Sequence, residues 1–546
     1  MARVARAARP RLVRAAQTVG PRLTRLRETS APQVARLREA VSPRLTRLQE
    51  TVSPQVARLT PPNGTWRFTA VATTAGLALA AAAVTAAGPW DSAGQRTAER
   101  DHAAAQEEAG GADHGRHVDI SAGAPHPAPS AGSVLAGLGG SSYTVKSAPK
   151  DTALADVLGP LLRDSALGTR HTGAVVDVTS GKRLYGTGAD EALTPASTTK
   201  IATAVAALSA LGADHRFTTR AALEPDTGEL VLVGGGDPTL TAHAPDGAAS
   251  SDSTDDWASL RTLADSTAAA LAKRGTRAVT LSYDTTLYSG PALHPIGVND
   301  NLAPVSALMA DEGRTDDSLS GPVTRLTNPA ADAARKFAGF LRKDGIRTTP
   351  PGPSKATGRA DTLATVSSPP LADLVERMLT NSDNDIAEAL ARQTAVAAGK
   401  RADFDGGAAA IAAQLTRLHL PVKGAVFHDG SGLNRDDRLT ADLLTALLVK
   451  AGDPAHPGLR PVLTGLPVAG FTGTLTSRYT GATGAAGVVR AKTGTLTGVN
   501  TLAGTVVDRD GRLLAFAFLA SDTTDPLAAQ SALDRTATAL AGCGCG

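Results

Sequence analysis

From about residue 145 onward, the apolar positions alternate between a helical period and the two-residue period of strands, which predicts a mixed body. Helices are predicted over residues 151–167, 257–275, 328–346 and 526–542, after the polar stretch 195–200, and as a helix–loop–helix over 371–399. Strands are predicted over 230–240 and 278–288, as a hairpin over 172–187 turning at Ser180 and Gly181, and as two or three strands within 488–522. Helices combined with an antiparallel sheet near the C-terminus indicate an α+β fold.

The pattern before residue 145 is different. A Pro-led motif returns every eleven residues from Pro10 to Pro54, and residues 1–59 carry thirteen Arg against three Glu, whereas the whole chain has a net charge of only +3. Eleven residues keep one helical face in register. Two interpretations of this tail, residues 1–67, remain open: short amphipathic helices that adhere to anionic lipid, or a disordered basic tail. Because the basic character belongs to the tail, we expect no nucleic-acid partner.

Residues 68–90 contain no charged residue and are long enough to cross a bilayer, with Trp66 and Trp90 on either side. We expect an uncleaved signal anchor in the plasma membrane, with the N-terminus in the cytoplasm and the catalytic domain outside. Cleavage near Ala86, which would give a secreted protein, is the alternative. The Ala-, Gly- and His-rich residues 91–140 are typical of a flexible extracytoplasmic linker.

The stretch PASTTK at residues 195–200 stands directly before an apolar run that ends at Gly212. On one interpretation Ser197 simply caps a helix. On the other, Ser197 is a nucleophile and Lys200, one helical turn later, is the base that activates it. Both can hold together. The same Ser-x-x-Lys spacing at Ser147 lies at the end of the linker and includes a Pro, so the spacing alone is a weak signal.

Two further motifs strengthen the second interpretation. Residues 382–384 read Ser-Asp-Asn in the loop between two predicted helices, and residues 492–494 read Lys-Thr-Gly on a predicted strand. Each alone is ordinary capping or edge-strand chemistry. In this order, on a helix start, an inter-helix loop and a strand, the three motifs are the set found in serine penicillin-recognising enzymes, which this chain therefore resembles.

The long separation of the first two motifs narrows the resemblance. Ser197 and Ser382 are 185 residues apart, and the chain also contains GGGDPTL and DGSGLNRDDRLT. Residues 150–541 thus resemble the type-4, class C low-molecular-mass penicillin-binding proteins, which are D-Ala-D-Ala carboxypeptidases of peptidase family S13. The resemblance implies a β-lactamase/DD-peptidase-like α+β fold. Its catalytic domain would comprise 141–216 and 366–546, with a large inserted region, 217–365, between the first two motifs.

The resemblance also implies roles for the motif residues. Ser197 attacks the carbonyl of the penultimate D-Ala and forms an acyl-enzyme, and Lys200 is its base. Burial and the nearby charge of Lys492 should lower the pKa of Lys200. Ser382 passes a proton to the leaving amine, and Asn384 holds an amide of the substrate.

The third motif is expected to bind the end of the substrate. Lys492 and Thr493 would bind its terminal carboxylate, and Gly494 would let its backbone lie close to the strand. The backbone N–H groups of Ser197 and Thr495 would form the oxyanion hole, and Leu496 would line the pocket. The loop over residues 429–440 is expected to shape the cleft, and the inserted region to shape the access to it, without a chemical role.

The predicted function is a serine D-Ala-D-Ala carboxypeptidase that acts on peptidoglycan stem peptides, with DD-endopeptidase activity left open. β-Lactams would be covalent inhibitors, and no metal or cofactor is expected. Two alternatives are a β-lactamase-like hydrolase and a non-enzymatic membrane scaffold that binds peptidoglycan or β-lactams. The absence of a recognisable deacylating Glu segment argues against the first, and the three intact motifs argue against the second. The pair Cys543 and Cys545 at the C-terminus provides no disulfide framework for the core.

Overall fold

The computed structural model describes residues 151–243, 257–479, 481 and 484–544. The basic tail, the expected anchor at 68–90 and the linker lie outside these residues, so they stay predictions. Within the described part of the chain, no helix combines the length and the apolar character that crossing a membrane requires.

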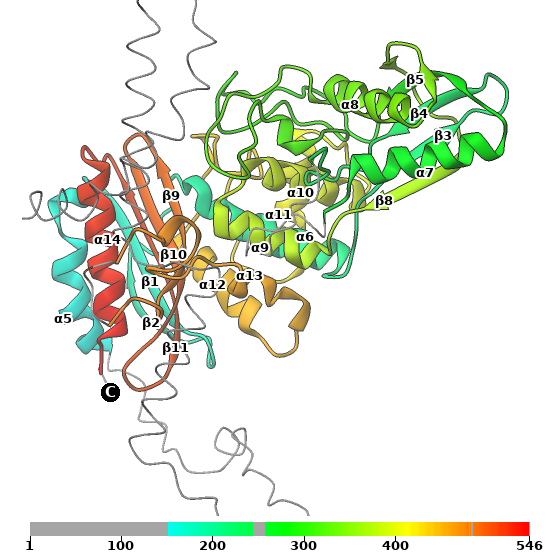
Figure 1. Ribbon diagram of the computed structural model, residues 1–546. Helices are drawn as coiled ribbons and strands as arrows, with labels where there is room; N and C mark the ends of the chain where they lie inside the picture. The colour runs from blue at the N-terminus through cyan, green and yellow to red at the C-terminus, as the bar shows by residue number, and fades with distance from the viewer. Residues whose placement is uncertain (1–150, 244–256, 480, 482–483, 545–546) are drawn as a thin grey trace, which may run out of the picture. The chain divides into compact units, whose positions relative to one another are not determined.

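The first sheet has the strand order β2-β1-β11-β10-β9 and is antiparallel throughout. Its strands are β1 (Arg170–Asp177), β2 (Arg183–Thr187), β9 (Arg490–Leu496), β10 (Val499–Val507) and β11 (Leu513–Ser521). Nearly every residue of β10 and β11 is buried, because helices cover both faces of the sheet (Figure 1). Helices α5 (Asp151–Leu162) and α14 (Pro526–Ala541) pack on one face, and α12 (Ala441–Gly452) packs on the other. The predicted hairpin and C-terminal strands are confirmed.

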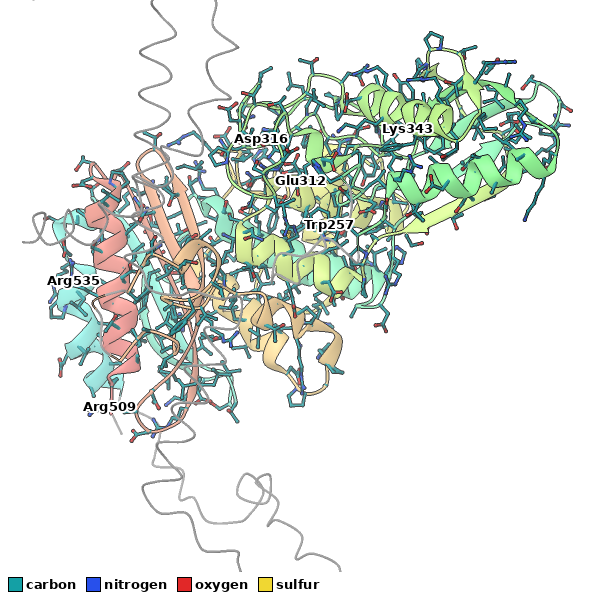
Figure 2. The ribbon with its side chains drawn as sticks, viewed as in Figure 1. Trp257, Glu312, Asp316, Lys343, Arg509 and Arg535 are labelled. Carbon is teal, nitrogen blue, oxygen red and sulfur yellow. The ribbon has the colours of Figure 1, made fainter. Side chains whose placement is uncertain are left out.

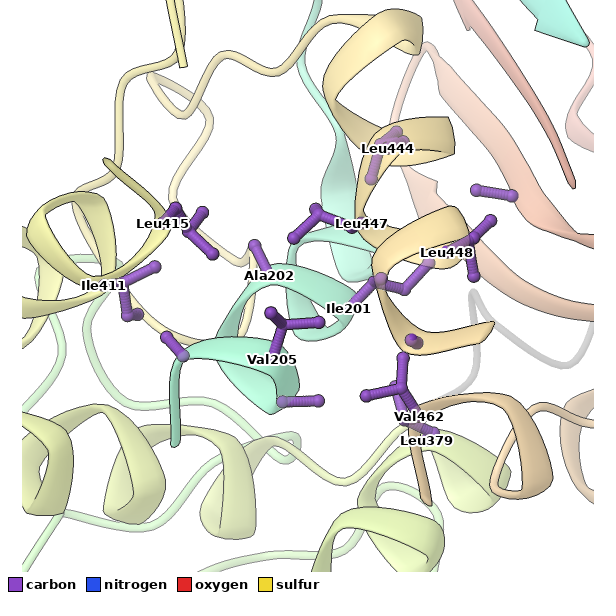
Figure 3. Packing of buried hydrophobic residues seen from close by; sticks show 14 of the residues in the cluster. Ile201, Ala202, Val205, Leu379, Ile411, Leu415, Leu444, Leu447, Leu448 and Val462 are labelled. Atoms are coloured by element: carbon purple, nitrogen blue, oxygen red, sulfur yellow. The ribbon is translucent and has the colours of Figure 1, made fainter. Parts of the chain in front are cut away.

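The helix behind PASTTK forms the centre of the molecule's largest apolar cluster. This helix, α6 (Thr199–Leu211), is buried over its first ten residues. It is surrounded by α12 and by α9 (Leu371–Asn381), α10 (Asn384–Ala397) and α11 (Phe404–Arg417). The abundant Ala side chains of α6 allow these helices to approach closely, and Leu, Ile and Val side chains fill the remaining space (Figure 3).

The start of this helix differs from the expectation. Ser197 does not cap α6: it lies in a preceding 3₁₀ turn, η2 (Ala196–Thr198), and neither the turn nor the helix has a side-chain cap. The hydroxyl of Ser197 is instead bonded to the Lys200 amine. Ala196, directly before it, has a left-handed backbone with φ of 48°. Gly212 ends the helix as predicted, with φ of 89°.

A second sheet lies within residues 218–367 and has the order β6-β5-β4-β3-β8, with β7 beside β5. Its strands are β3 (Thr218–Leu223), β4 (Glu229–Val233), β5 (Ala278–Asp284), β6 (Arg347–Thr348), β7 (Gly352–Pro353) and β8 (Asp361–Ser367). Unlike the first sheet it is mixed, because β5 runs parallel to its neighbours. Helices α7 (Leu260–Lys273) and α8 (Pro329–Lys343) pack against it and enclose an apolar core of their own.

A buried cluster of charges joins the segment after β5 to the α9–α10 loop. Glu312, in the short turn η3 (Asp311–Gly313), receives a hydrogen bond of 2.9 Å from Nε of Arg314. Arg325 donates from Nη1 to the carbonyl of Glu312 at 2.7 Å, and its Nη2 lies 3.0 Å from Oδ2 of Asp385. The carboxyl groups of Glu312, Asp383 and Asp385 lie together, with one oxygen of each within 4.8 Å of the others. Figure 2 labels Glu312 in the interior of this region.

The cluster is neutralised internally. Burial, together with the charges of Asp383 and Asp385, raises the pKa of Glu312 well above its ordinary value, which favours its neutral form. The guanidinium group of Arg314 faces Glu312, and that of Arg325 faces Asp385. The cluster therefore fixes the α9–α10 loop to the segment that carries the second sheet.

Replacing Leu447 of α12 by Ala should lower the free energy of unfolding by about 2–5 kcal/mol, because this side chain is fully buried in the cluster around α6. The matched control is Leu527→Ala in α14, where the side chain is 72% exposed and the change should stay within about 0.5 kcal/mol. Urea unfolding of the two variants measures both values, and equal losses would contradict the packing described here.

Replacing Arg325 by Met should cost about 3–5 kcal/mol of folding free energy, because it leaves Asp385 and the Glu312 carbonyl buried without their cation. The control is Arg359→Met, whose ion pair with Asp226 is largely exposed and should contribute little. Urea unfolding distinguishes them; an Arg325→Met variant as stable as the control would show that the cluster does not brace the fold.

Candidate active site

A cavity of about 370 Å³ brings the three motifs together. It is lined by residues from the η2 turn, the α9–α10 loop and strand β9, which are far apart in the sequence. Of the predicted site residues, Ser197, Ser382, Asn384, Thr493 and Thr495 line the cavity. The other three, Lys200, Lys492 and Gly494, are buried behind its wall. Leu496 lines the cavity, as predicted.

Lys200 lies at the back of this cavity, and its amine makes three hydrogen bonds. Nζ lies 3.0 Å from Oγ of Ser197, 2.7 Å from Oδ1 of Asn384 and 2.7 Å from the carbonyl oxygen of Ser431. The side chain is completely buried. Burial lowers the pKa of Lys200 to about 8, although nearby carboxylates, first of all Asp429, oppose the shift. The predicted direction of this shift is confirmed.

The α9–α10 loop places the second motif. Ser382 ends α9 in a left-handed conformation, with φ of 59°. Asp383 caps α10 by accepting the N–H of Ile386 at 2.9 Å. The amide of Asn384 is oriented from its other end, because Nδ2 donates to the carbonyl of Asn301 at 2.9 Å. This bond leaves Oδ1 of Asn384 as the acceptor for Lys200.

Strand β9 carries the third motif at the edge of the first sheet. The Lys492 amine is buried and donates to the Thr493 carbonyl at 2.8 Å. Burial and the charge of Lys200 hold the pKa of Lys492 well below its ordinary value. The hydroxyl of Thr493 donates to that of Thr474 at 3.0 Å, so Thr474 joins the lining of the cavity.

Gly494 has a packing role that differs from the expected one. A Cβ at this buried position would lie only 2.7 Å from the carbonyl oxygen of Pro195 and would collide with the hydroxyl of Thr501. The glycine thus lets β9 lie directly against the turn that carries Ser197. Its expected role, to let the substrate backbone lie close to the strand, stays a prediction.

The loop that follows residue 428 does more than shape the cleft. Its Ser431 carbonyl contacts the Lys200 amine directly. Glu388 of α10 accepts the N–H of Ser431 at 2.8 Å and that of Gly430 at 3.1 Å. The hydroxyl of Thr203, on α6, donates to the Gly430 carbonyl at 2.6 Å. The loop was expected only to shape the cleft; it also supplies an acceptor to the Lys200 amine.

The region predicted as an insertion also reaches the site. Its Asn301 orients Asn384, and its His294 lies with Nε2 3.0 Å from Oδ2 of Asp429 in a fully buried contact. The interpretation that this region only controls access is therefore incomplete, because it supplies partners to the residues that surround Lys200.

Among the described residues, two groups of side chains have ligand atoms close enough to hold a metal ion: His294, Glu388 and Asp429 form one, and Glu312, Asp383 and Asp385 form the other. In the first, backbone N–H groups already occupy the carboxylates. In the second, arginines neutralise them. The carboxylates of both groups thus already have partners within the protein, although Oε1 of Glu312 and Oδ2 of Asp385 accept no hydrogen bond.

Sequence reasoning missed Glu388, Asp429 and His294. One signal was available: Asn384, Glu388 and Arg392 follow at four-residue spacing along a helix whose interior is otherwise mainly apolar, and such residues share one face. His294 and Asp429 come from irregular segments, where no periodic pattern singles them out.

The D-Ala-D-Ala carboxypeptidase 3 (S13) family model matches residues 154–322 and 315–540. The chain is 38% identical over 418 residues to "Carboxypeptidase DacB" of Mycolicibacterium smegmatis, covering 73% of this chain and 86% of that protein. It is 31% identical to "D-alanyl-D-alanine carboxypeptidase" of Actinomadura sp., covering 70% and 84%. The fold matches the crystal structure of penicillin binding protein 4 from Haemophilus influenzae with a TM-score of 0.55 at 21% identity, covering 69% and 97%. With its mixed α/β penicillin-recognising fold, the chain belongs to the D-Ala-D-Ala carboxypeptidase 3 (S13) family.

Proposed function

We propose that this protein is a serine D-Ala-D-Ala carboxypeptidase that cleaves peptidoglycan stem peptides through an acyl-enzyme on Ser197. The observation that carries the proposal is the contact between the Ser197 hydroxyl and the buried Lys200 amine, behind a cavity lined by the other two motifs. The names of the relatives support the same activity. Whether the released amine belongs to a free D-Ala or to a cross-linked stem does not change this first step.

The geometry suits Lys200 to act as a base. A neutral amine has two N–H groups and one free electron pair. The two acceptors at 2.7 Å, from Asn384 and Ser431, take both N–H groups. The electron pair is then left facing the Ser197 hydroxyl at 3.0 Å. With a pKa of about 8, roughly a tenth of the molecules hold Lys200 neutral at pH 7.

The reaction then follows the chemistry of acyl transfer. As Oγ of Ser197 attacks the carbonyl carbon of the penultimate D-Ala, its proton passes to Lys200. The backbone N–H groups of Ser197 and Thr495 receive the developing oxyanion. The C–N bond breaks as Ser382 delivers a proton to the leaving amine, and water later hydrolyses the ester. The positions of Ser382 and Thr495 on the cavity wall support these roles.

The carboxylate of the substrate would bind beside Thr493, with Lys492 behind it. A carboxylate entering this part of the cavity would favour the charged form of Lys492 and oppose its burial. A β-lactam carries a carboxylate in the corresponding place and would acylate Ser197 in the same manner. The ester that it forms would be lost slowly, which makes it an inhibitor.

For the remainder of the chain we propose a single-pass anchor at residues 68–90, with the catalytic part outside the membrane. The uncharged stretch between Trp66 and Trp90 supports it. This arrangement would place the cavity on the side where peptidoglycan lies, and the basic tail would face the anionic inner leaflet.

The activity can be tested with a stem pentapeptide ending in D-Ala-D-Ala. We expect D-Ala release that penicillin blocks and that Ser197→Ala reduces by about a thousandfold or more. Mass spectrometry should find the penicilloyl adduct on Ser197 of the wild-type protein. Rapid turnover of penicillin would instead favour the β-lactamase alternative, and neither release nor labelling would refute the proposal.

Replacing Lys200 by Met should slow acylation by penicillin about a thousandfold or more, because Ser197 loses its base while the apolar part of the side chain is kept. The control is Lys450→Met in α12, a lysine outside the cavity lining. Stopped-flow fluorescence with a labelled penicillin measures both rates. Acylation of Lys200→Met within tenfold of wild type would exclude the assigned role.

A further inference from the structure

We propose that Glu388 is a positioning residue for the base: it holds the Ser431 carbonyl against the Lys200 amine, so that the free electron pair of the amine points at Ser197. The inference rests on the proposed function. It assigns a role to a residue that lies outside all three motifs and does not line the cavity.

The contacts of Glu388 are directed at the backbone of one turn. Its side chain is 1% exposed, and its Oε1 accepts the N–H groups of Ser431 at 2.8 Å and Gly430 at 3.1 Å. Oε2 accepts the Gly430 N–H as well, at 3.2 Å. Two successive peptide groups are thus fixed by one carboxyl. The Ser431 carbonyl belongs to the next peptide group, whose N–H, that of Gly432, donates to Asp429. Glu388 fixes the peptide groups directly before it, and so limits the direction of this carbonyl toward Lys200 from one side of the turn.

One face of α10 therefore controls both acceptors of the Lys200 amine. Asn384 provides its Oδ1 directly. Glu388, four residues later on the same helical face, provides the Ser431 carbonyl indirectly. A shift of either acceptor would free an N–H group to turn toward Ser197 and would move the electron pair away from the hydroxyl.

Asp429 and His294 hold the other side of the turn. Asp429 accepts the N–H groups of Gly432 and Asn434, each at 2.6 Å. The contact between its Oδ2 and Nε2 of His294 anchors it to the inserted region. Gly432 has φ of 81°, and a Cβ there would collide with the Ala196 carbonyl, so the turn is packed directly against the one that carries Ser197.

The charge of Glu388 adds a second effect, on the protonation of Lys200. The carboxyls of Asp429, Glu388, Asp383 and Asp385 act on this amine, and each favours its charged form. On the other side, Lys200 faces the Lys492 amine across the site.

The sign of the effect follows from the charge of the carboxylate. Burial and the charge of Asp429 raise the pKa of Glu388 to about 7, and in its charged form Glu388 favours the charged form of Lys200. Removing that negative charge lowers the pKa of Lys200. Since the neutral amine is the active form, the rise of the acylation rate with pH should then begin at lower pH.

Three variants separate the effect of the hydrogen bonds that Glu388 accepts from the effect of its charge. Glu388→Ala removes the hydrogen bonds and the charge. Glu388→Gln keeps an oxygen that can accept the N–H groups of Ser431 and Gly430, removes the charge, and replaces the second carboxylate oxygen by an NH2 group. Thr394→Val is the control: Thr394 is buried on the same helix, and its hydroxyl bonds only to the Leu390 carbonyl one turn earlier. The wild type and all three variants are compared as full-length protein in three assays: acylation rate by labelled penicillin from pH 5.5 to 9.5, kcat and KM for D-Ala release, and thermal unfolding.

For Glu388→Ala we expect kcat and the acylation rate to fall about a hundredfold, with KM within about threefold, because the substrate cavity is untouched. Glu388→Gln should be acylated at least about tenfold faster than Glu388→Ala. The rise of its acylation rate with pH, the acid limb of the profile, should lie about half to one pH unit lower than that of the wild type. Thr394→Val should match the wild type in rate and in pH profile.

Each contrary result has a distinct meaning. If the wild type is not acylated at Ser197, the proposed function and this inference both fail. If the wild type is acylated and Glu388→Ala reacts within threefold of it, the inference alone is overturned. Equal losses in Glu388→Ala and Glu388→Gln, with an unmoved acid limb, would show that Glu388 only supports the fold and would also overturn it.

Discussion

The buried amine of Lys200 is the constraint on which the rest of the structure depends. A lysine ammonium removed from water is unstable unless every N–H group has an acceptor, and a lysine that keeps its ordinary pKa would be no base at neutral pH. The protein meets both demands. It gives the amine three oxygen partners, and it withholds any carboxylate from direct contact, so that burial lowers the pKa to about 8. The carboxyls of Asp429 and Glu388 limit the shift by their charge, while their oxygens accept backbone N–H groups of the turn at Ser431.

This arrangement needs parts of the chain that are widely separated. The acceptors of Lys200 come from α10 and from the turn at Ser431, and both are held by the region between the first two motifs. Asn301 orients one acceptor, and His294 anchors the turn that carries the other through Asp429. Arg325 and Glu312 fix the loop before α10. The inserted region is therefore a structural part of the catalytic centre, whatever further role it has toward the cell wall.

The sequence was sufficient to predict most of the helices, the hairpin, the C-terminal strands and the three motifs, because each of these depends on a local periodic pattern or on a short run of residues. Helices α11 and α12 were not predicted. The sequence was insufficient where the role of a residue depends on contacts with distant parts of the chain. From the sequence alone Ser197 could be a helix cap, but in the structure its hydroxyl is hydrogen-bonded to the Lys200 amine. Gly494 looks suited to substrate approach, yet its missing Cβ faces Pro195 and Thr501, from segments about three hundred residues apart. The contact of Ser431 with Lys200 spans 231 residues and uses a backbone oxygen, which no residue type reveals.

The most direct test of this account is the ionisation of Lys200 itself. Lysine labelled with ¹³C at Cε allows its NMR shift to be followed with pH, and the signal is assigned by its loss in Lys200→Met. The account predicts a midpoint near 8, well below the ordinary lysine value of 10.5. A midpoint at or above 10.5 in a protein that still forms the acyl-enzyme would mean that Lys200 remains charged. Its role as the base, and the arrangement of the surrounding residues as its support, would then be wrong.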